Sequence, residues 1–220
     1  MDLKQEALHL MPKITKLTAS KINDSQYQLS QISWHTGESN TDLGFSELAK
    51  EKCIESFNEI NINKELSLTV DVPDLLLTFK RGNIHTNFKI ELKSTKSNDG
   101  SVPGSMIKSL DPNMWTIFCF RKGSEFQVRY GRYYLGMSKG THDLFQDRSP
   151  RPRLHFENYQ SVQEEPNLTE TTVDKSFYKH YAKSAVNRVL DPKGRHSWQD
   201  DLTKEIIKIA ITDQEKFKDI

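Results

Sequence analysis

The segment that decides the fold is VPDLLLTFKRGNIHTNFKIELK, residues 72–93. Both of its halves have the composition of short β-strands, and Gly-Asn between two such runs is a signal for a two-residue hairpin turn. The second half alternates apolar with charged residues: Phe88, Ile90 and Leu92 against Lys89, Glu91 and Lys93. Because side chains along a strand point alternately to opposite faces, Glu91 and Lys93 are expected on the face opposite the apolar set.

A hairpin that turns at Gly82 and Asn83 places Asp74 opposite Glu91. Two carboxylates in this relation, with Cβ atoms about 5 Å apart, repel each other. A divalent cation between them turns the repulsion into attraction, and oxygen ligands of this kind suit Mg²⁺. With the Lys93 ammonium group beside it, such a site is suited to the hydrolysis of phosphate esters. The alternative interpretation is that these are ordinary charged positions on a solvated face.

The arrangement Pro73-Asp74 … Glu91-Leu92-Lys93 resembles the motif of the PD-(D/E)xK nuclease superfamily, and most of all that of its type II restriction endonucleases. The resemblance covers residues 42–134, and it implies an α/β fold with a central mixed β-sheet flanked by helices, the restriction-endonuclease-like core. It also implies that Asp74, Glu91 and the Leu92 carbonyl hold a metal ion. Lys93 would position the attacking water molecule or help to deprotonate it.

Residues 42–60 have apolar side chains at three- and four-residue spacing, which predicts an amphipathic helix. In the superfamily, a glutamate from the helix that precedes the core strands often joins the metal site. By this resemblance Glu47, and after it Glu51, is the expected contributor. The alternative is that both acids are solvated, as acids on an amphipathic helix usually are.

The remaining elements complete a single nuclease domain over residues 1–220, with core 42–134. Before the core we expect a helix over 1–10 that stops before Pro12, then a strand or irregular segment over 27–34. Runs with strand composition are 65–70, 115–120 and 125–134; the second is apolar throughout, as in a strand covered on both faces. A basic loop follows at 139–153, and added C-terminal helices are expected within 171–217.

Two polar, turn-rich segments supply the candidate DNA contacts, because basic, hydroxyl and amide groups bind phosphates and base edges. The candidates are Lys96, Ser97, Ser105, Lys139, Arg148, Arg151 and Arg153. The alternative interpretation is that both segments are plain surface loops.

Composition bounds the remaining possibilities. The formal net charge is +1, so any DNA-binding surface must be local, with compensating acids elsewhere. Two cysteines, Cys53 and Cys119, are too few for a disulfide framework or a zinc site and favour a reducing cytoplasm. The first residues lack the pattern of a signal peptide, and no apolar run approaches membrane-spanning length, so no membrane association is expected.

The resemblance therefore predicts a Mg²⁺-dependent type II restriction enzyme that hydrolyses double-stranded DNA at a specific sequence, without a small-molecule cofactor. A homodimer is expected, because two-fold symmetric subunits place one active site on each strand of a palindrome. Two alternatives stay open. One is a repair, junction-resolving or transposon-end nuclease, and the other is a non-catalytic DNA-binding module.

Overall fold

A computed structural model describes residues 2–34, 43–61, 66–96, 99–104, 111, 113–137, 153–166, 204–208 and 211–212. The chain divides into two compact units. The first comprises Met1–Val102, Asp111–Gly136 and His155–Glu170, and the second comprises Pro103–Leu110, Met137–Leu154 and Thr171–Ile220. The single domain expected over residues 1–220 stays a prediction.

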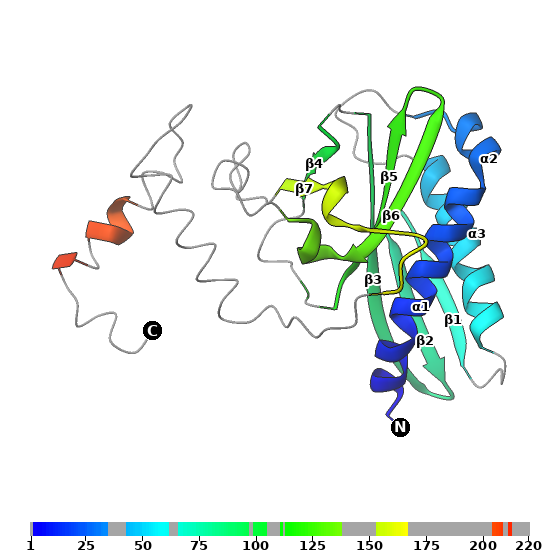
Figure 1. The fold of residues 1–220 in the computed structure, drawn as a ribbon. Helices are drawn as coiled ribbons and strands as arrows, with labels where there is room; N and C mark the ends of the chain where they lie inside the picture. The colour runs from blue at the N-terminus through cyan, green and yellow to red at the C-terminus, as the bar shows by residue number, and fades with distance from the viewer. Residues whose placement is uncertain are drawn as a thin grey trace. The chain divides into compact units, whose positions relative to one another are not determined.

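The first unit is built on a six-stranded mixed β-sheet in the order β1-β2-β3-β5-β6-β8 (Figure 1). Its strands are β1 (Ser67–Asp71), β2 (Leu75–Arg81), β3 (Ile84–Thr95), β5 (Trp115–Lys122), β6 (Glu125–Arg132) and β8 (Gln160–Ser161). Strands β3 and β5 are parallel, and the other neighbouring pairs are antiparallel. The predicted α/β class with a mixed sheet is confirmed.

The hairpin of β2 and β3 has the predicted register. Arg81 pairs with Ile84 across the turn, and Leu75 pairs with Ile90 at the far end of the ladder. Gly82 has φ +57°, a left-handed conformation that a residue without a Cβ atom adopts at little cost. The turn chemistry therefore fixes which residues of the two strands face each other.

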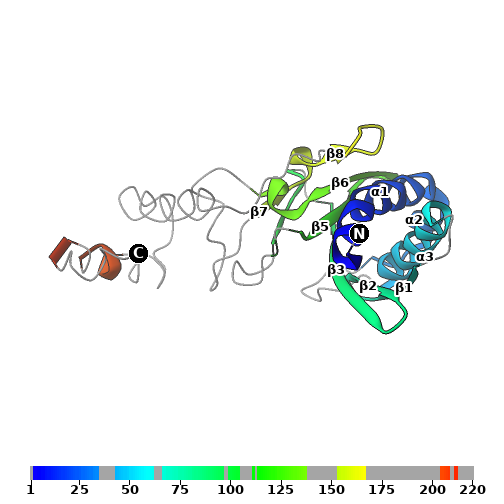
Figure 2. The ribbon, with the colours of Figure 1, turned by 90° about the horizontal axis from the view of Figure 1, so that it is seen from below.

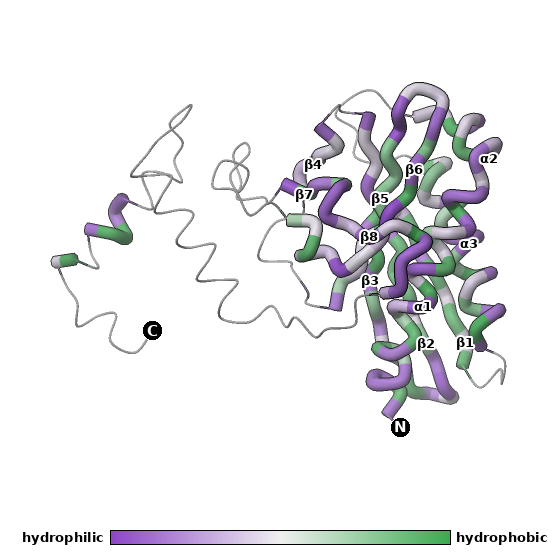
Figure 3. The backbone as a smooth tube through the Cα atoms, in the orientation of Figure 1, coloured by the Kyte–Doolittle hydropathy of each residue, from purple (hydrophilic) through white to green (hydrophobic). Residues whose placement is uncertain are grey.

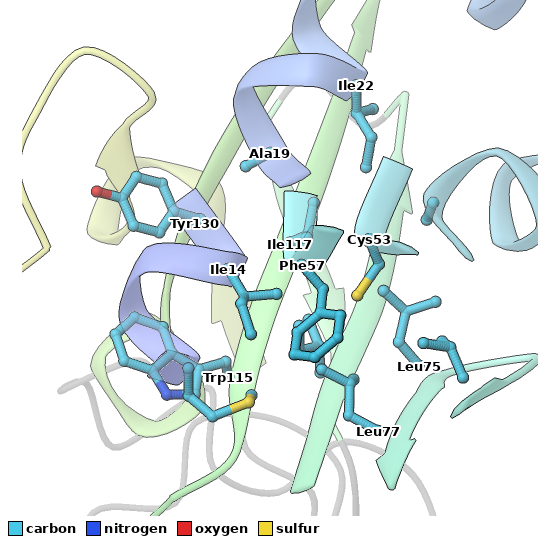
Figure 4. Close-up of a cluster of buried hydrophobic side chains, with 14 of the residues drawn as sticks. Ile14, Ala19, Ile22, Cys53, Phe57, Leu75, Leu77, Trp115, Ile117 and Tyr130 are labelled. Carbon is cyan, nitrogen blue, oxygen red and sulfur yellow. The ribbon is translucent and has the colours of Figure 1, made fainter. Parts of the chain in front are cut away.

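Helices α1 (Leu3–Asp24) and α3 (Leu43–Ile60) pack on one face of the sheet, and the short α2 (Gln26–Gln31) lies between them in the chain. Figure 2 shows the sheet curving around α1 and α3. Along both helices Figure 3 shows hydrophobic and hydrophilic positions interspersed, as expected when only one side is buried. Figure 4 shows the core that results, in which Ile14 and Phe57 from the helices meet strand residues such as Leu77 and Ile117.

Two predictions for the N-terminal region are wrong. Helix α1 continues through Pro12, and residues 27–31 belong to the helix α2 and not to a strand or irregular segment, whereas 32–34 are irregular. Proline inside a helix costs about 3 kcal/mol. Here Met11 and Ile14, which flank it, are fully buried, so core packing outweighs that cost. Tyr27 is 75% exposed while Leu29 is fully buried, so the apolar residues of this segment do not share one buried strand face.

Within the described residues, two short 3₁₀ turns and their aromatic side chains lie on the second face of the sheet. The 3₁₀ turns η2 (Tyr133–Gly136) and η4 (Phe156–Asn158) lie beside β6, and the Phe118 ring packs against the rings of Phe156 and Tyr159. Residues 115–119 are all buried, which confirms that β5 is covered on both faces. The short strands β4 (Ser101–Pro103) and β7 (Arg153–His155) form a separate two-stranded sheet.

Little of the predicted C-terminal part lies within the described residues. Residues 204–208 and 211–212 are helical, in agreement with the expected helix there, while the rest of 171–217 lies outside the described residues. The basic loop 139–153 also lies outside them, apart from Arg153. Within the part of the chain that is described, no helix is both long enough and apolar enough to cross a membrane.

Candidate active site

Asp74 is held in place by the strand on the other side of the hairpin. It is the last residue of the turn that connects β1 to β2, one position before the ladder begins at Leu75. Its Oδ1 atom accepts a hydrogen bond from the Leu92 backbone N–H at 3.0 Å. This bond leaves the second carboxylate oxygen, Oδ2, directed to other partners.

Glu91 is a buried carboxylate in the middle of β3. Only 3% of the residue is exposed, while its neighbour Ile90 is fully buried on the opposite, apolar face. The predicted alternation along β3 is therefore confirmed. A carboxylate so far removed from water needs close cationic or hydrogen-bonding partners to stay ionised.

Lys93 supplies one of these partners. Its Nζ atom lies 2.7 Å from Glu91 Oε1, so the ammonium group and the carboxylate are on the same face of β3, as the sequence predicts. The Lys93 side chain is only 22% exposed.

The second partner is Lys89, which the sequence analysis did not place in the site. Its Nζ atom lies 2.6 Å from Glu91 Oε2 and 2.9 Å from Asp74 Oδ2. An ammonium group therefore occupies the gap between the two carboxylates, where a divalent cation is predicted. The signal for this residue was present, because Lys89 has the same position in the strand alternation as Glu91 and Lys93.

These contacts set the protonation states. Burial by itself raises the pKa of Glu91, but the positive charge of Lys93 and the hydrogen bond from Lys89 outweigh it and lower that pKa to about 2. Burial likewise lowers the pKa of Lys89, whereas its hydrogen bonds to Glu91 and Asp74 raise it, and the net result is a raised pKa. The ionised forms of Glu91 and Lys89 stabilise each other at neutral pH.

The rings of Phe118 and Tyr159 form an apolar wall beside the charged residues. Glu91 pairs with Thr116, and Lys93 pairs with Phe118, on the neighbouring strand β5. The Tyr159 ring, which packs on Phe118, is buried, and its hydroxyl group donates a hydrogen bond to the Tyr133 carbonyl at 3.1 Å. Such a wall lowers the local dielectric constant, which strengthens every charge–charge interaction next to it.

The two carboxylates fit a divalent cation. Asp74 Oδ2 and Glu91 Oε2 both lie within 3 Å of one cationic atom, Lys89 Nζ, so the two side chains converge on a common point. Mg²⁺ is commonly held by one or two carboxylates, with water and substrate phosphate completing its coordination. The described residues contain no cluster of three or more His, Cys, Asp or Glu side chains around a common point. Leu92 as a further ligand, through its carbonyl, stays a prediction.

The structure does not bring Glu47 to these carboxylates. It is an exposed residue of α3 and lines a surface pocket together with Gln28 and Ile32 of the α2 region. Helix α3 packs through Phe57 on Phe79, which lies on the apolar face of the sheet, whereas Glu91 points to the other face. Glu51, the second choice, lies in the same pocket and forms an ion pair with Lys52 at 2.8 Å.

Of the candidate DNA contacts, two belong to the described residues. Lys96 is exposed and comes directly after the end of β3, and Arg153 is half-buried in β7. The others lie outside the described residues: Ser97, Ser105, Lys139, Arg148 and Arg151. DNA contact by any of them stays a prediction.

Comparisons with protein-family models, curated proteins and solved structures give no match to this chain. The resemblance to PD-(D/E)xK nucleases therefore rests on the motif and on the geometry of the residues that carry it.

Proposed function

We propose that this protein is a Mg²⁺-dependent endodeoxyribonuclease that cuts double-stranded DNA at a specific sequence, as type II restriction enzymes do. The observation that carries the proposal is the convergence of Asp74 Oδ2 and Glu91 Oε2 on one cationic position, with the Lys93 ammonium on the other oxygen of Glu91. Two acids and a lysine in this arrangement, at a hairpin of a mixed sheet, match the chemistry that metal-assisted phosphodiester hydrolysis requires.

Each residue has a defined role in this proposal. Asp74 and Glu91 hold the metal ion, and the hydrogen bond from the Leu92 N–H fixes the orientation of Asp74. When bound, Mg²⁺ supplies Lewis acidity toward a phosphoryl oxygen and a water molecule. Lys93 keeps Glu91 ionised and offers its ammonium group to the water molecule or to the negative charge that develops on the phosphate. The wall at Phe118 and Tyr159 excludes water from one side of these charges.

The proposal also covers the substrate, the oligomeric state and the cellular location. The substrate is duplex DNA, bound by Lys96 and by basic residues of the loop 139–153, and the active form is a homodimer that cuts both strands of a palindrome. A cytoplasmic location is part of the proposal, from the presence of only two cysteines.

The test is to incubate the purified protein with phage DNA and Mg²⁺ and to sequence the ends of any fragments. Discrete fragments with one sequence at every end are expected from the wild type. Asp74→Asn and a sample with excess EDTA are the controls, and neither should cut. Failure to cut any DNA with Mg²⁺ or Mn²⁺ would contradict the proposal.

Supercoiled plasmid and branched DNA identify the competing functions. Nicks, or cuts confined to branch points, would indicate a repair, junction-resolving or transposon-end nuclease. DNA binding without cleavage would indicate a binding module, in which the two acids and two lysines serve only as a mutually neutralising set of ion pairs.

A further inference from the structure

Lys89 is a charged residue of this site that the motif does not account for. Its Nζ atom contacts both carboxylates, at 2.9 Å from Asp74 Oδ2 and 2.6 Å from Glu91 Oε2. Among the described residues, Lys93 forms its ion pair with Glu91 through the other oxygen, Oε1. The two lysines therefore hold different positions, and of these two Lys89 fills the gap between the acids.

A divalent cation and the Lys89 ammonium group cannot share that gap. Mg²⁺ binds carboxylate oxygens at about 2.0–2.1 Å, closer than the ammonium now lies to either oxygen. A metal ion at bonding distance from both oxygens would therefore lie within a few ångströms of Nζ, where like charges repel strongly beside an apolar wall. Metal binding at these carboxylates requires that Lys89 leave.

The side chain of Lys89 is able to leave. It is 39% exposed, and its four-carbon stem allows the ammonium group to swing into solvent. Lys93 is less exposed, at 22%, and contacts the oxygen that points away from the gap. It can remain in place when a metal ion enters, so Glu91 keeps one cationic partner throughout.

We propose that Lys89 is the counter-ion of Asp74 and Glu91 in the metal-free protein, that a divalent cation must displace it, and that this competition lowers the metal affinity of the site. The inference rests on the proposed function for the presence of a metal ion. Asp74 and Glu91 bind the metal ion in the proposed function, and Lys89 is added here as a residue that lowers their affinity for it. The cost of metal binding is the loss of two close ion pairs, those of Lys89 with Asp74 and with Glu91.

Calorimetric titration of Mn²⁺ into the DNA-free protein measures this competition without any need for turnover. Lys89→Met keeps most of the aliphatic stem and removes the ammonium group. We expect it to bind Mn²⁺ roughly ten- to a hundredfold more tightly than the wild type, because the metal ion no longer has to displace an ammonium group that is paired with both carboxylates. Adding Asp74→Asn to Lys89→Met should remove the gain.

The control variant is Lys80→Met. Lys80 is an exposed lysine on β2, near the hairpin turn, and it loses the same charge by the same substitution. Its Mn²⁺ affinity should equal that of the wild type. If Lys89→Met binds Mn²⁺ no more tightly than the wild type, or if no variant binds Mn²⁺, the inference is overturned.

A second measurement uses the wild-type protein, so it does not depend on how well a variant folds. Lysines are acetylated briefly with acetic anhydride, with and without Mn²⁺, and the modification of each lysine is followed by peptide mass spectrometry. Mn²⁺ should increase the labelling of Lys89 severalfold and leave Lys80 unchanged. Labelling of Lys89 that does not respond to Mn²⁺ would also overturn the inference.

The inference and the proposed function can fail separately. A wild type that cuts DNA while Lys89→Met shows unchanged Mn²⁺ affinity would retain the nuclease and remove the role of Lys89. A tighter metal site in Lys89→Met, in a protein that cuts no DNA, would retain the competition and remove the nuclease.

Discussion

The buried charge of Glu91 leads to a prediction about stability that does not depend on catalysis. Lys93 and Lys89 lower the pKa of Glu91 in the folded protein from the ordinary 4.5 to about 2. A carboxyl group with a lowered pKa in the folded state contributes stability above its unfolded-state pKa, and that contribution is lost as the pH falls toward the folded-state value. Glu91 should therefore stabilise the metal-free protein at pH 6 and lose this effect between pH 4.5 and pH 2.

The magnitude follows from the size of the shift. Each pKa unit corresponds to about 1.4 kcal/mol, so a shift from 4.5 to about 2 gives Glu91 a contribution of roughly 3 kcal/mol at pH 6. At pH 3, about 2 kcal/mol of this should be gone. Solvent screens this carboxylate little, because only 4% of the Glu91 side chain is exposed.

The assay is urea denaturation of the wild type and of Glu91→Gln at several pH values between 3 and 6, in the presence of EDTA. Glutamine cannot ionise, so the difference in the free energy of unfolding between the two proteins should shrink as the pH falls. Glu157→Gln is the control, since it removes one carboxylate that pairs with Arg129 but is 72% exposed. A difference between wild type and Glu91→Gln that stays constant from pH 6 to pH 3 would refute the electrostatic account of this site.

Three further predictions concern catalysis and packing. Lys93→Ala should lower the rate of DNA cleavage at least about 100-fold, with DNA binding retained in a gel-shift assay; cleavage at the wild-type rate would rule out its assigned role. Gly136→Ala should lower the free energy of unfolding by at least about 2 kcal/mol, because a Cβ atom there would lie 2.0 Å from the Tyr159 ring. Leu77→Ala, at a fully buried core position, should cost about 2–5 kcal/mol by the same denaturation assay, and a smaller loss would mean that the core collapses around the cavity.

Local sequence patterns were sufficient to predict the hairpin of β2 and β3. The Gly-Asn turn and the period-two alternation depend on backbone geometry within a few residues, so they predicted the pairing of Leu75 with Ile90 and the face on which Glu91 lies. The helix over 43–60 was also predictable, because its apolar spacing is an intrinsic property of the segment.

Non-local packing explains where local sequence patterns were insufficient. Pro12 is a strong local signal for a helix end, but the burial of Met11 and Ile14 in the core outweighs it. The expectation for Glu47 depended on where α3 packs, and α3 packs on the apolar face of the sheet. Neither outcome could be obtained from periodicity, which identifies the buried side of a helix but not the partner that buries it.

The sequence by itself determined that Asp74, Glu91 and Lys93 share one side of a hairpin, because strand alternation and turn type leave a single register that buries the apolar residues. Only the tertiary structure decided what lies between the two acids. Strand alternation places Lys89 on the same face as Glu91, but alternation does not show which of several lysines contacts the acids. Its choice of partners is fixed by the position of Asp74 at the strand end and by the depth at which Glu91 is buried, and both depend on the packing of the whole sheet.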